Sequence, residues 1–208
     1  MPFLKEFIIN GSSKISLWKV NLGELKTLKL NNKDSKLLKM KKHRLLKEQF
    51  LATRKIIELE NPKNKINYND NGKPSLNSSV NISISHSNDL AAIAFSENKC
   101  MGIDVQLIKK KILKIQNKFL SKSEKISLGK NPSADILTNI WTSKESIYKA
   151  LGIKGLSFSN NIMIEEVKKN KTFATGYYIN GEDRIQFDLN FFYIDKYILC
   201  YAQQNEKL

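Results

Sequence analysis

The 208-residue sequence has few cysteines and no long hydrophobic segment. Its two cysteines, Cys100 and Cys200, lie in apolar, strand-like surroundings without the spacing of a metal site, so we expect buried free thiols. No apolar run approaches the roughly 20 residues of a membrane span. The first ten residues include an early acid and no long apolar core, unlike a signal peptide. We therefore expect a cytoplasmic protein without a membrane partner.

Arginine is also scarce, yet positive charge is in clear excess. The 35 lysines and arginines outnumber the 20 acids and give a formal net charge of +15. This excess favours an anionic partner, such as nucleic acid, a phosphorylated small molecule or an acidic protein. A compositional bias explains it equally well, because the chain has only three arginines and its lysines are spread along the sequence. No nucleic-acid-binding motif accompanies the charge. We therefore expect no nucleic-acid partner, and a basic nucleic-acid-binding protein is the less favoured alternative.

The first hundred residues predict short strands followed by one long helix. Residues 3–9 and 15–20 have the pattern of two strands, and residues 34–60 repeat apolar side chains at helical spacing before a proline ends the helix. This helix carries Arg44 and Arg54. Where lysine is the usual cation, an arginine suggests the planar geometry that binds phosphate or carboxylate, although a surface role is more frequent for either residue alone.

Residues 68–76 form a turn-rich segment that holds Lys73 in a constrained position. Residues 80–86 then alternate apolar and polar side chains, as in a half-buried strand that ends at Ser85 and His86. Hydroxyl groups beside an imidazole at the end of a strand fit a phosphate pocket. A histidine in a turn is by itself more often structural, so the pocket depends on its neighbours.

The next predicted hairpin consists of strands at 90–95 and 100–107. Asp104 lies in the middle of the second strand, and the apolar residues around it share the opposite face. A buried acid is stable only with a cation or a hydrogen-bond partner, so we favour a metal ligand over a purely structural aspartate. Gly102, just before it, would let another group approach the backbone closely.

A second long helix is predicted from about residue 135 to Gly152, after two short helices at 112–119 and 123–128. Glu145 and Lys149 lie off its apolar stripe and are four residues apart, so their side chains emerge on one face. Taken alone, such a pair indicates only a surface ion pair worth about 0.3–0.5 kcal/mol. The rest of the chain predicts an antiparallel meander with strands at 162–167, 172–179, 184–193 and 197–203 and turns at 168–171 and 180–183.

Both halves of the sequence therefore combine strands with one principal helix, as expected for a two-lobed α+β protein. Four segments point to a family: GKPSL (72–76), SISHS (83–87), GIDVQ (102–106) and WTSKESIYKALGIKGL (141–156). In this order and at these separations they resemble the Sfp-type 4′-phosphopantetheinyl transferases, and the resemblance spans most of the chain.

The resemblance implies a function and a fold. Members of this family transfer 4′-phosphopantetheine from coenzyme A to a serine of an acyl, peptidyl or aryl carrier protein. They require Mg²⁺ and release adenosine 3′,5′-bisphosphate. Their fold implies two similar lobes here, a pseudo-dimer of residues 1–100 and 101–208, with coenzyme A in the cleft between them. Two lobes in one chain make a monomer the expected state.

The resemblance also implies roles for single residues. Asp104 and Glu145 match the family's Mg²⁺ ligands, and Glu145 is the expected base for the carrier serine, ahead of His86. Lys144 and Lys149 would offset the charge on the phosphates and the leaving group. The residues that match contacts with coenzyme A are Arg44, Lys73, Ser85, His86, Asp104, Lys144 and Lys149, with Arg54 as a further candidate.

Gln106 departs from the family pattern, because most members have a second acid at this position. Its amide oxygen can still bind a hard cation or hold a coordinating water, but it supplies no charge. We therefore expect the metal to depend on Asp104, Glu145, the diphosphate and water. A homologue that binds coenzyme A without turnover is the alternative that this departure allows.

The carrier proteins of this family are typically acidic, which fits the positive charge of the chain. The lysine-rich residues 109–125 are the candidate docking surface, with Phe119 and Leu120 as apolar contacts. Packing in the core is an equally good explanation for these two side chains.

Overall fold

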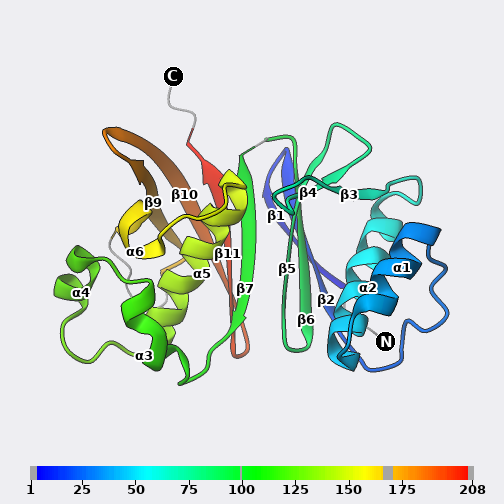
Figure 1. Cartoon of the computed structure of the whole chain (residues 1–208), viewed down its shortest axis with the longest axis horizontal. Helices are drawn as coiled ribbons and strands as arrows, with labels where there is room; N and C mark the ends of the chain where they lie inside the picture. Colours follow the sequence, from blue (N-terminus) through cyan, green and yellow to red (C-terminus); the bar gives the residue numbers. More distant parts are fainter. Residues whose placement is uncertain (1–3, 99, 166–170, 206–208) are drawn as a thin grey trace.

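A computed structural model of the chain describes residues 4–98, 100–165 and 171–205. Two β-sheets lie face to face in the centre, and helices cover the outer face of each sheet (Figure 1). The layers are therefore helix, sheet, sheet, helix. This arrangement confirms the α+β class predicted from the sequence. Within the described residues, the N-terminal and C-terminal sheets share no strand.

The N-terminal sheet contains four antiparallel strands in the order β1-β2-β6-β5. Helix α2 (Arg44–Glu60) packs its apolar face on the outside of this sheet, where Ile56 and Ile93 are among the buried side chains. The strands are β1 (Leu4–Asn10), β2 (Ser13–Lys19), β5 (Asn81–Ser87) and β6 (Leu90–Ser96). The accompanying elements are helix α1 (Asn32–Met40) and a separate hairpin of β3 (Ile66–Tyr68) and β4 (Pro74–Leu76).

The C-terminal sheet contains five antiparallel strands in the order β7-β11-β10-β9-β8. Helix α5 (Ala134–Leu151) covers its outer face and ends at Gly152 in a left-handed conformation, as the sequence predicts. The strands are β7 (Met101–Leu107), β8 (Ile162–Glu165), β9 (Phe173–Asn180), β10 (Asp183–Ile194) and β11 (Tyr197–Gln204). The shorter helices are α3 (Ile112–Ile115), the 3-10 helix Gln116–Lys118, α4 (Lys122–Leu128) and α6 (Phe158–Asn161).

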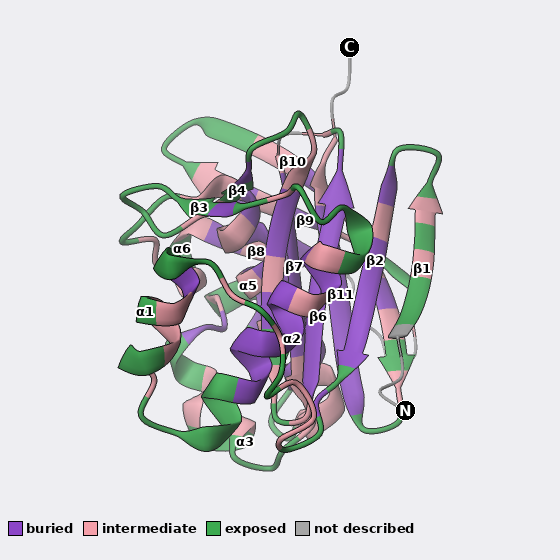
Figure 2. Ribbon diagram, turned by 90° about the vertical axis from the view of Figure 1, so that its right-hand side faces the viewer, coloured by how far each residue is buried: buried purple, intermediate pink, exposed green. Residues whose placement is uncertain are grey.

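Apolar side chains fill the space between the two sheets. Ile103 and Val105 of β7 pack there against residues of β2, β6 and β11. Because side chains alternate along a strand, Gly102, Asp104 and Gln106 face the other way. Figure 2 shows the contrast between the buried inner strands and the largely exposed edge strand β1.

Three predicted elements differ from the structure. The helix predicted at 34–60 is divided into α1 and α2, because Lys41 and His43 have extended backbone conformations between them. The turn-rich segment 68–76 belongs to the short β3–β4 hairpin. The strand predicted at 162–167 is described as far as the end of β8, and the turn predicted at 168–171 lies, except for its last residue, outside the described residues.

Two expectations drawn from composition concern membranes and cysteines. Among the described helices, none combines the length and the apolar character of a membrane span. Neither Cys100 nor Cys200 is in a disulfide. Cys200 is buried as expected, and this burial raises the pKa of its thiol to about 12, whereas Cys100 is only partly buried.

Candidate functional site

Asp104 is almost fully buried on β7, and three side chains donate hydrogen bonds to its carboxylate. Oδ1 accepts one from Lys149 Nζ at 2.7 Å and one from Ser85 Oγ at 2.7 Å. Oδ2 accepts one from Gln106 Nε2 at 2.8 Å. The sequence predicts that this acid needs a cation or a hydrogen-bond partner, and Lys149 is the cation. Strand β7, helix α5 and strand β5 therefore meet at one carboxylate.

Helix α5 lies close to β7 because Gly102 has no side chain. A Cβ atom at Gly102 would lie 2.0 Å from the carbonyl oxygen of Ser146 and 2.6 Å from the amide nitrogen of Ala150. Only glycine permits this contact, which confirms the predicted close approach. The contact sets the face of α5 that carries Lys149 against Asp104.

Glu145 lies beside Asp104 on the same helix as Lys149. Burial raises the pKa of Glu145 to about 7, and the neighbouring Asp104 carboxylate adds to this rise, while Lys149 opposes it. Within the described residues the Glu145 carboxylate has no hydrogen bond or ion pair. The simple ion pair between Glu145 and Lys149 is therefore not formed, because Lys149 bonds to Asp104 instead.

His86 and Lys41 extend this cluster toward the N-terminal half. Desolvation lowers the pKa of His86, and the positive charges of Lys149 and Lys41 lower it further, while Asp104 raises it. The imidazole is therefore mostly neutral near pH 7. The sequence motifs do not predict Lys41, which lies between α1 and α2. The only indication in the sequence is the short basic run around it.

The turn at Lys73 docks on the C-terminal end of α5. Lys73 Nζ donates to the carbonyl oxygen of Ala150 at 2.5 Å, and Asn71 Nδ2 donates to that of Gly152 at 2.9 Å. Carbonyl groups at a helix end favour such a cation, although burial lowers the pKa of Lys73. A cavity of about 140 Å³ lies between this turn, β5 and α5, and Lys149 lines it. The turn thus lies beside the cluster, with its ammonium group on the helix end.

Lys144 does not face the cluster, contrary to the prediction from the family motif. Its side chain is fully buried, and Nζ donates to the Glu124 carboxylate at 2.7 Å. Nζ also donates to three backbone carbonyl oxygens, those of Phe119, Phe158 and Ile162, at 2.8, 2.9 and 2.6 Å. All three hydrogens of the ammonium group are engaged inside the C-terminal half. The Lys144 ammonium group is therefore not available to contact coenzyme A.

Phe119 and Leu120 belong to the core of the C-terminal half. Their exposed fractions are 0% and 3%, and the Phe119 ring packs edge-on against Trp141 with centroids 5.2 Å apart. A docking contact requires exposed surface, so the prediction that these two side chains touch a carrier protein is wrong. Core packing, the alternative explanation, is confirmed.

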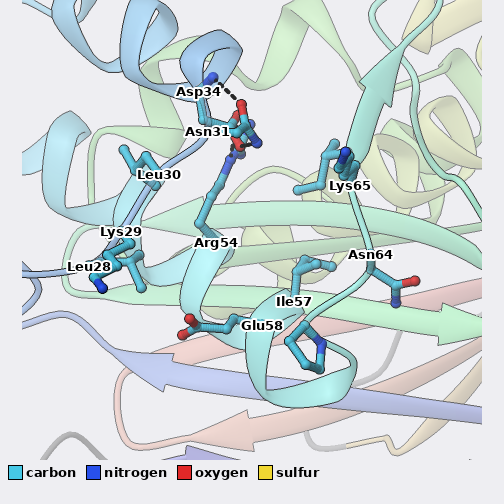
Figure 3. A pocket seen from close by; sticks show the side chains of 12 residues that line it. Leu28, Lys29, Leu30, Asn31, Asp34, Arg54, Ile57, Glu58, Asn64 and Lys65 are labelled. Carbon is cyan, nitrogen blue, oxygen red and sulfur yellow. Dashed lines mark hydrogen bonds and ion pairs between the residues drawn. The ribbon is translucent and has the colours of Figure 1, made fainter.

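Arg54 is held in a structural ion pair. Its guanidinium group is buried on α2, where Nε and Nη2 donate to Asp34 Oδ1 at 3.1 and 2.8 Å. Figure 3 shows this pair at a cavity of about 190 Å³ that α2 forms with residues 28–31 and 62–66. No residue of the Asp104 cluster lines this cavity, so the structure does not bring Arg54 to the site. Arg44 is exposed at the start of α2, and its contact with coenzyme A stays a prediction.

The donor atoms of the cluster fit a hard cation such as Mg²⁺. Among the described residues, no group of three or more His, Cys, Asp or Glu side chains could hold a metal ion. Asp104 and Glu145 are the two carboxylates of this cluster. Burial raises the pKa of Glu145, and the charge of Asp104 adds to this rise. Mg²⁺ keeps several waters and needs only one or two protein carboxylates. The Gln106 amide nitrogen donates a hydrogen bond to Asp104, which leaves the amide oxygen available as an uncharged metal ligand.

Two comparisons with known proteins agree with the motifs. Residues 100–202 match the family model of the 4′-phosphopantetheinyl transferase superfamily. A protein of Aneurinibacillus migulanus, 4′-phosphopantetheinyl transferase gsp, is 30% identical over 149 residues, which cover 69% of this chain and 61% of the relative. The chain thus spans less than two thirds of that protein. The matched residues 100–202 include β7 and α5, which carry Asp104, Glu145 and Lys149. The resemblance is confirmed, and residues 100–202 form a domain of the 4′-phosphopantetheinyl transferase superfamily.

Proposed function

We propose that the chain transfers 4′-phosphopantetheine from coenzyme A to a serine of an apo acyl or peptidyl carrier protein, with Mg²⁺ as the metal ion. The observation that carries this proposal is the cluster of Asp104, Glu145 and Lys149. These residues lie in the segment that matches the superfamily. A relative named as a 4′-phosphopantetheinyl transferase supports the same activity.

The proposal includes an arrangement of the chain. Residues 1–100 and 101–208 would form two lobes of a cytoplasmic monomer, with coenzyme A in the cleft between them. The cavity of about 140 Å³ supports this placement, because the turn at Lys73 lines one side of it and α5 lines the other. Lys41, His86 and Arg44 would supply further contacts for the phosphates from the N-terminal half.

The reaction breaks one phosphorus–oxygen bond and forms another. The hydroxyl oxygen of the carrier serine attacks the β-phosphorus of the coenzyme A diphosphate, and adenosine 3′,5′-bisphosphate leaves with the bridging oxygen. Such a transition state is stabilised mainly by positioning and by neutralisation of charge. Asp104 and Glu145 would hold Mg²⁺, which supplies part of that neutralisation when bound. Gln106 would add a neutral oxygen or support a water.

Glu145 is the group best suited to accept the proton of the serine hydroxyl. Before the metal binds, burial and the neighbouring Asp104 raise the pKa of this carboxyl group to about 7, so that it is ionised in part near neutral pH. It would accept the proton directly or through a metal-bound water. Lys149 lies next to this group and to Asp104. Its ammonium group would offset charge on the diphosphate and on the leaving group.

An acidic carrier protein would dock on the lysine-rich residues 109–125. Because Phe119 and Leu120 are buried, the apolar part of this surface would come from the exposed side chains of Leu113 on α3 and Ile126 at its edge on α4. Attraction between opposite charges accelerates encounter and weakens as salt increases. Transfer should therefore become slower at high ionic strength, mainly through a higher KM for the carrier.

The test of this function is direct. The protein is incubated with coenzyme A, Mg²⁺ and an apo carrier protein, and the carrier is analysed by mass spectrometry. We expect the mass of one phosphopantetheine group to be added, and no addition to a carrier whose acceptor serine is replaced by alanine. Failure to modify any of several acyl and peptidyl carriers would contradict the proposal.

A further inference from the structure

Three serines of β5 bond to the backbone of β7, where the two sheets meet. β5 and β7 are the edge strands of their sheets and lie side by side (Figure 1). An edge strand leaves alternate N–H groups without a partner strand. Here serine hydroxyls accept these hydrogens: the donors are the amides of Ile103, Val105 and Leu107, and the acceptors are Ser83, Ser85 and Ser87, at 3.0, 3.1 and 3.1 Å respectively.

Ser85 has a second bond that the other two serines lack among the described residues. Its Oγ donates to Asp104 Oδ1 at 2.7 Å, a short distance that is typical of a hydroxyl bound to a charged carboxylate. A serine hydroxyl has a single hydrogen. While that hydrogen is bound to Asp104, Ser85 has no hydrogen to donate to a phosphate. The side chain is also buried, with 4% of its residue surface exposed.

The Asp104 carboxylate is consequently fixed from three sides. Ser85 comes from the N-terminal sheet, Lys149 from α5 and Gln106 from the same strand. Lys149 and Gln106 have long, flexible side chains, and Lys149 is partly exposed. The hydroxyl of Ser85 is on a short side chain, and its position is set by the bond from the Val105 amide. Ser85 is therefore the most rigid of the three donors.

We propose that Ser85 is a positioning residue that orients the Asp104 carboxylate for metal binding, and that it does not contact the phosphates of coenzyme A. The inference rests on the proposed function and gives this serine a different role from the one that the family motif implies. Loss of a hydrogen bond to a metal-binding carboxylate typically weakens metal affinity by roughly tenfold or more.

The experiment compares Ser85→Ala with Ser87→Ala. Both substitutions remove one bond to a β7 amide, but only Ser85→Ala removes the donor to Asp104. Mn²⁺ binding is measured by electron paramagnetic resonance at saturating coenzyme A, and coenzyme A binding is measured by calorimetry without metal. We expect Ser85→Ala to weaken Mn²⁺ binding about tenfold and to change coenzyme A affinity less than twofold, while Ser87→Ala changes neither.

Two results would overturn the proposal. Weaker coenzyme A binding by Ser85→Ala with unchanged Mn²⁺ binding would indicate a phosphate contact. Equal effects of both substitutions on Mn²⁺ binding would indicate a general role of the serine bonds between the sheets. If Ser85→Ala does not fold, Ser85→Cys preserves the packing with a weak donor and should show the same loss of Mn²⁺ affinity. Absence of carrier modification by the wild type would refute the proposed function. The comparison of Mn²⁺ affinities would still decide whether Ser85 orients Asp104.

Discussion

Replacement of Lys144 by methionine should destabilise the protein strongly, because it leaves the buried Glu124 carboxylate without its cation. Lys144 and Glu124 have side-chain exposed fractions of 0% and 5%, and their charged atoms are 2.7 Å apart. Removing one partner of a buried ion pair typically costs about 3–5 kcal/mol. For a chain of this size, that loss corresponds to a decrease in Tm of roughly 6–20 °C.

The measurement is the free energy of unfolding from urea titration, with two comparison variants. Lys125→Met removes an exposed lysine from α4, the helix that carries Glu124, and should change stability by less than about 0.5 kcal/mol. Glu124→Gln in the Lys144→Met background removes the unpaired charge and should restore part of the lost stability. The coupling between the two sites should exceed about 1 kcal/mol, as expected for residues in contact.

A different role for Lys144 would give a different result. If its ammonium group contacted the phosphates of coenzyme A, as the family motif implies, Lys144→Met would raise the KM for coenzyme A and leave unfolding unchanged within about 0.5 kcal/mol. That outcome would refute the structural role.

Three further predictions concern single positions. In protein treated with chelator, Glu145→Gln should raise Tm more at pH 8 than at pH 5. The pKa of Glu145 is raised from 4.5 to about 7 in the folded protein. Ionisation of this group therefore costs up to about 3 kcal/mol of stability as pH rises through this interval, and glutamine avoids that cost. An unchanged pH dependence of Tm would contradict this. Gly102→Ala should reduce stability by about 3 kcal/mol or prevent folding, because the Cβ of the alanine would collide with the Ser146 carbonyl. In the control Gly11→Ala the added Cβ lies in open space, so urea unfolding should change little. Phe119→Ala should cost about 3–5 kcal/mol in the same assay, and a normal stability combined with a raised KM for the carrier would restore the docking role.

The central strand of the site could be predicted because its pattern is local. Apolar residues at alternate positions place Asp104 on the face opposite the core, and desolvation then requires a partner for the acid. The same alternation places Gly102 on the face that carries Asp104. A residue without a side chain on that face predicts that another part of the protein approaches the strand closely there. The structure supplies what the pattern lacked, namely that the approaching group is α5.

The two lysines of α5 show why the rest could not be predicted. Lys144 and Lys149 have the same chemistry, but five residues along a helix place them about 140° apart around its axis. One therefore faces Glu124, and the other faces Asp104. The partner of Lys144 lies 20 residues away in the sequence, on a helix whose packing no local pattern specifies. The family motif assigned a phosphate contact to both.

Lys41 was missed for a similar reason. A continuous helix over 34–60 would have placed it on a helix face among many exposed lysines. The break between α1 and α2 instead leaves it in extended backbone, within the electrostatic range of His86. Neither proline nor glycine marks that break in the sequence.

The proposed transfer requires a metal site at Asp104 and Glu145. Its most direct test is the rate of carrier modification by Asp104→Ala and Glu145→Ala at saturating Mg²⁺ and coenzyme A, with circular dichroism to confirm folding. Glu165→Ala, which removes an exposed acid paired with Arg184 on the surface, is the matched control. We predict no detectable transfer by the two site variants and a wild-type rate for the control. A rate within twofold of wild type for either site variant would contradict this metal site.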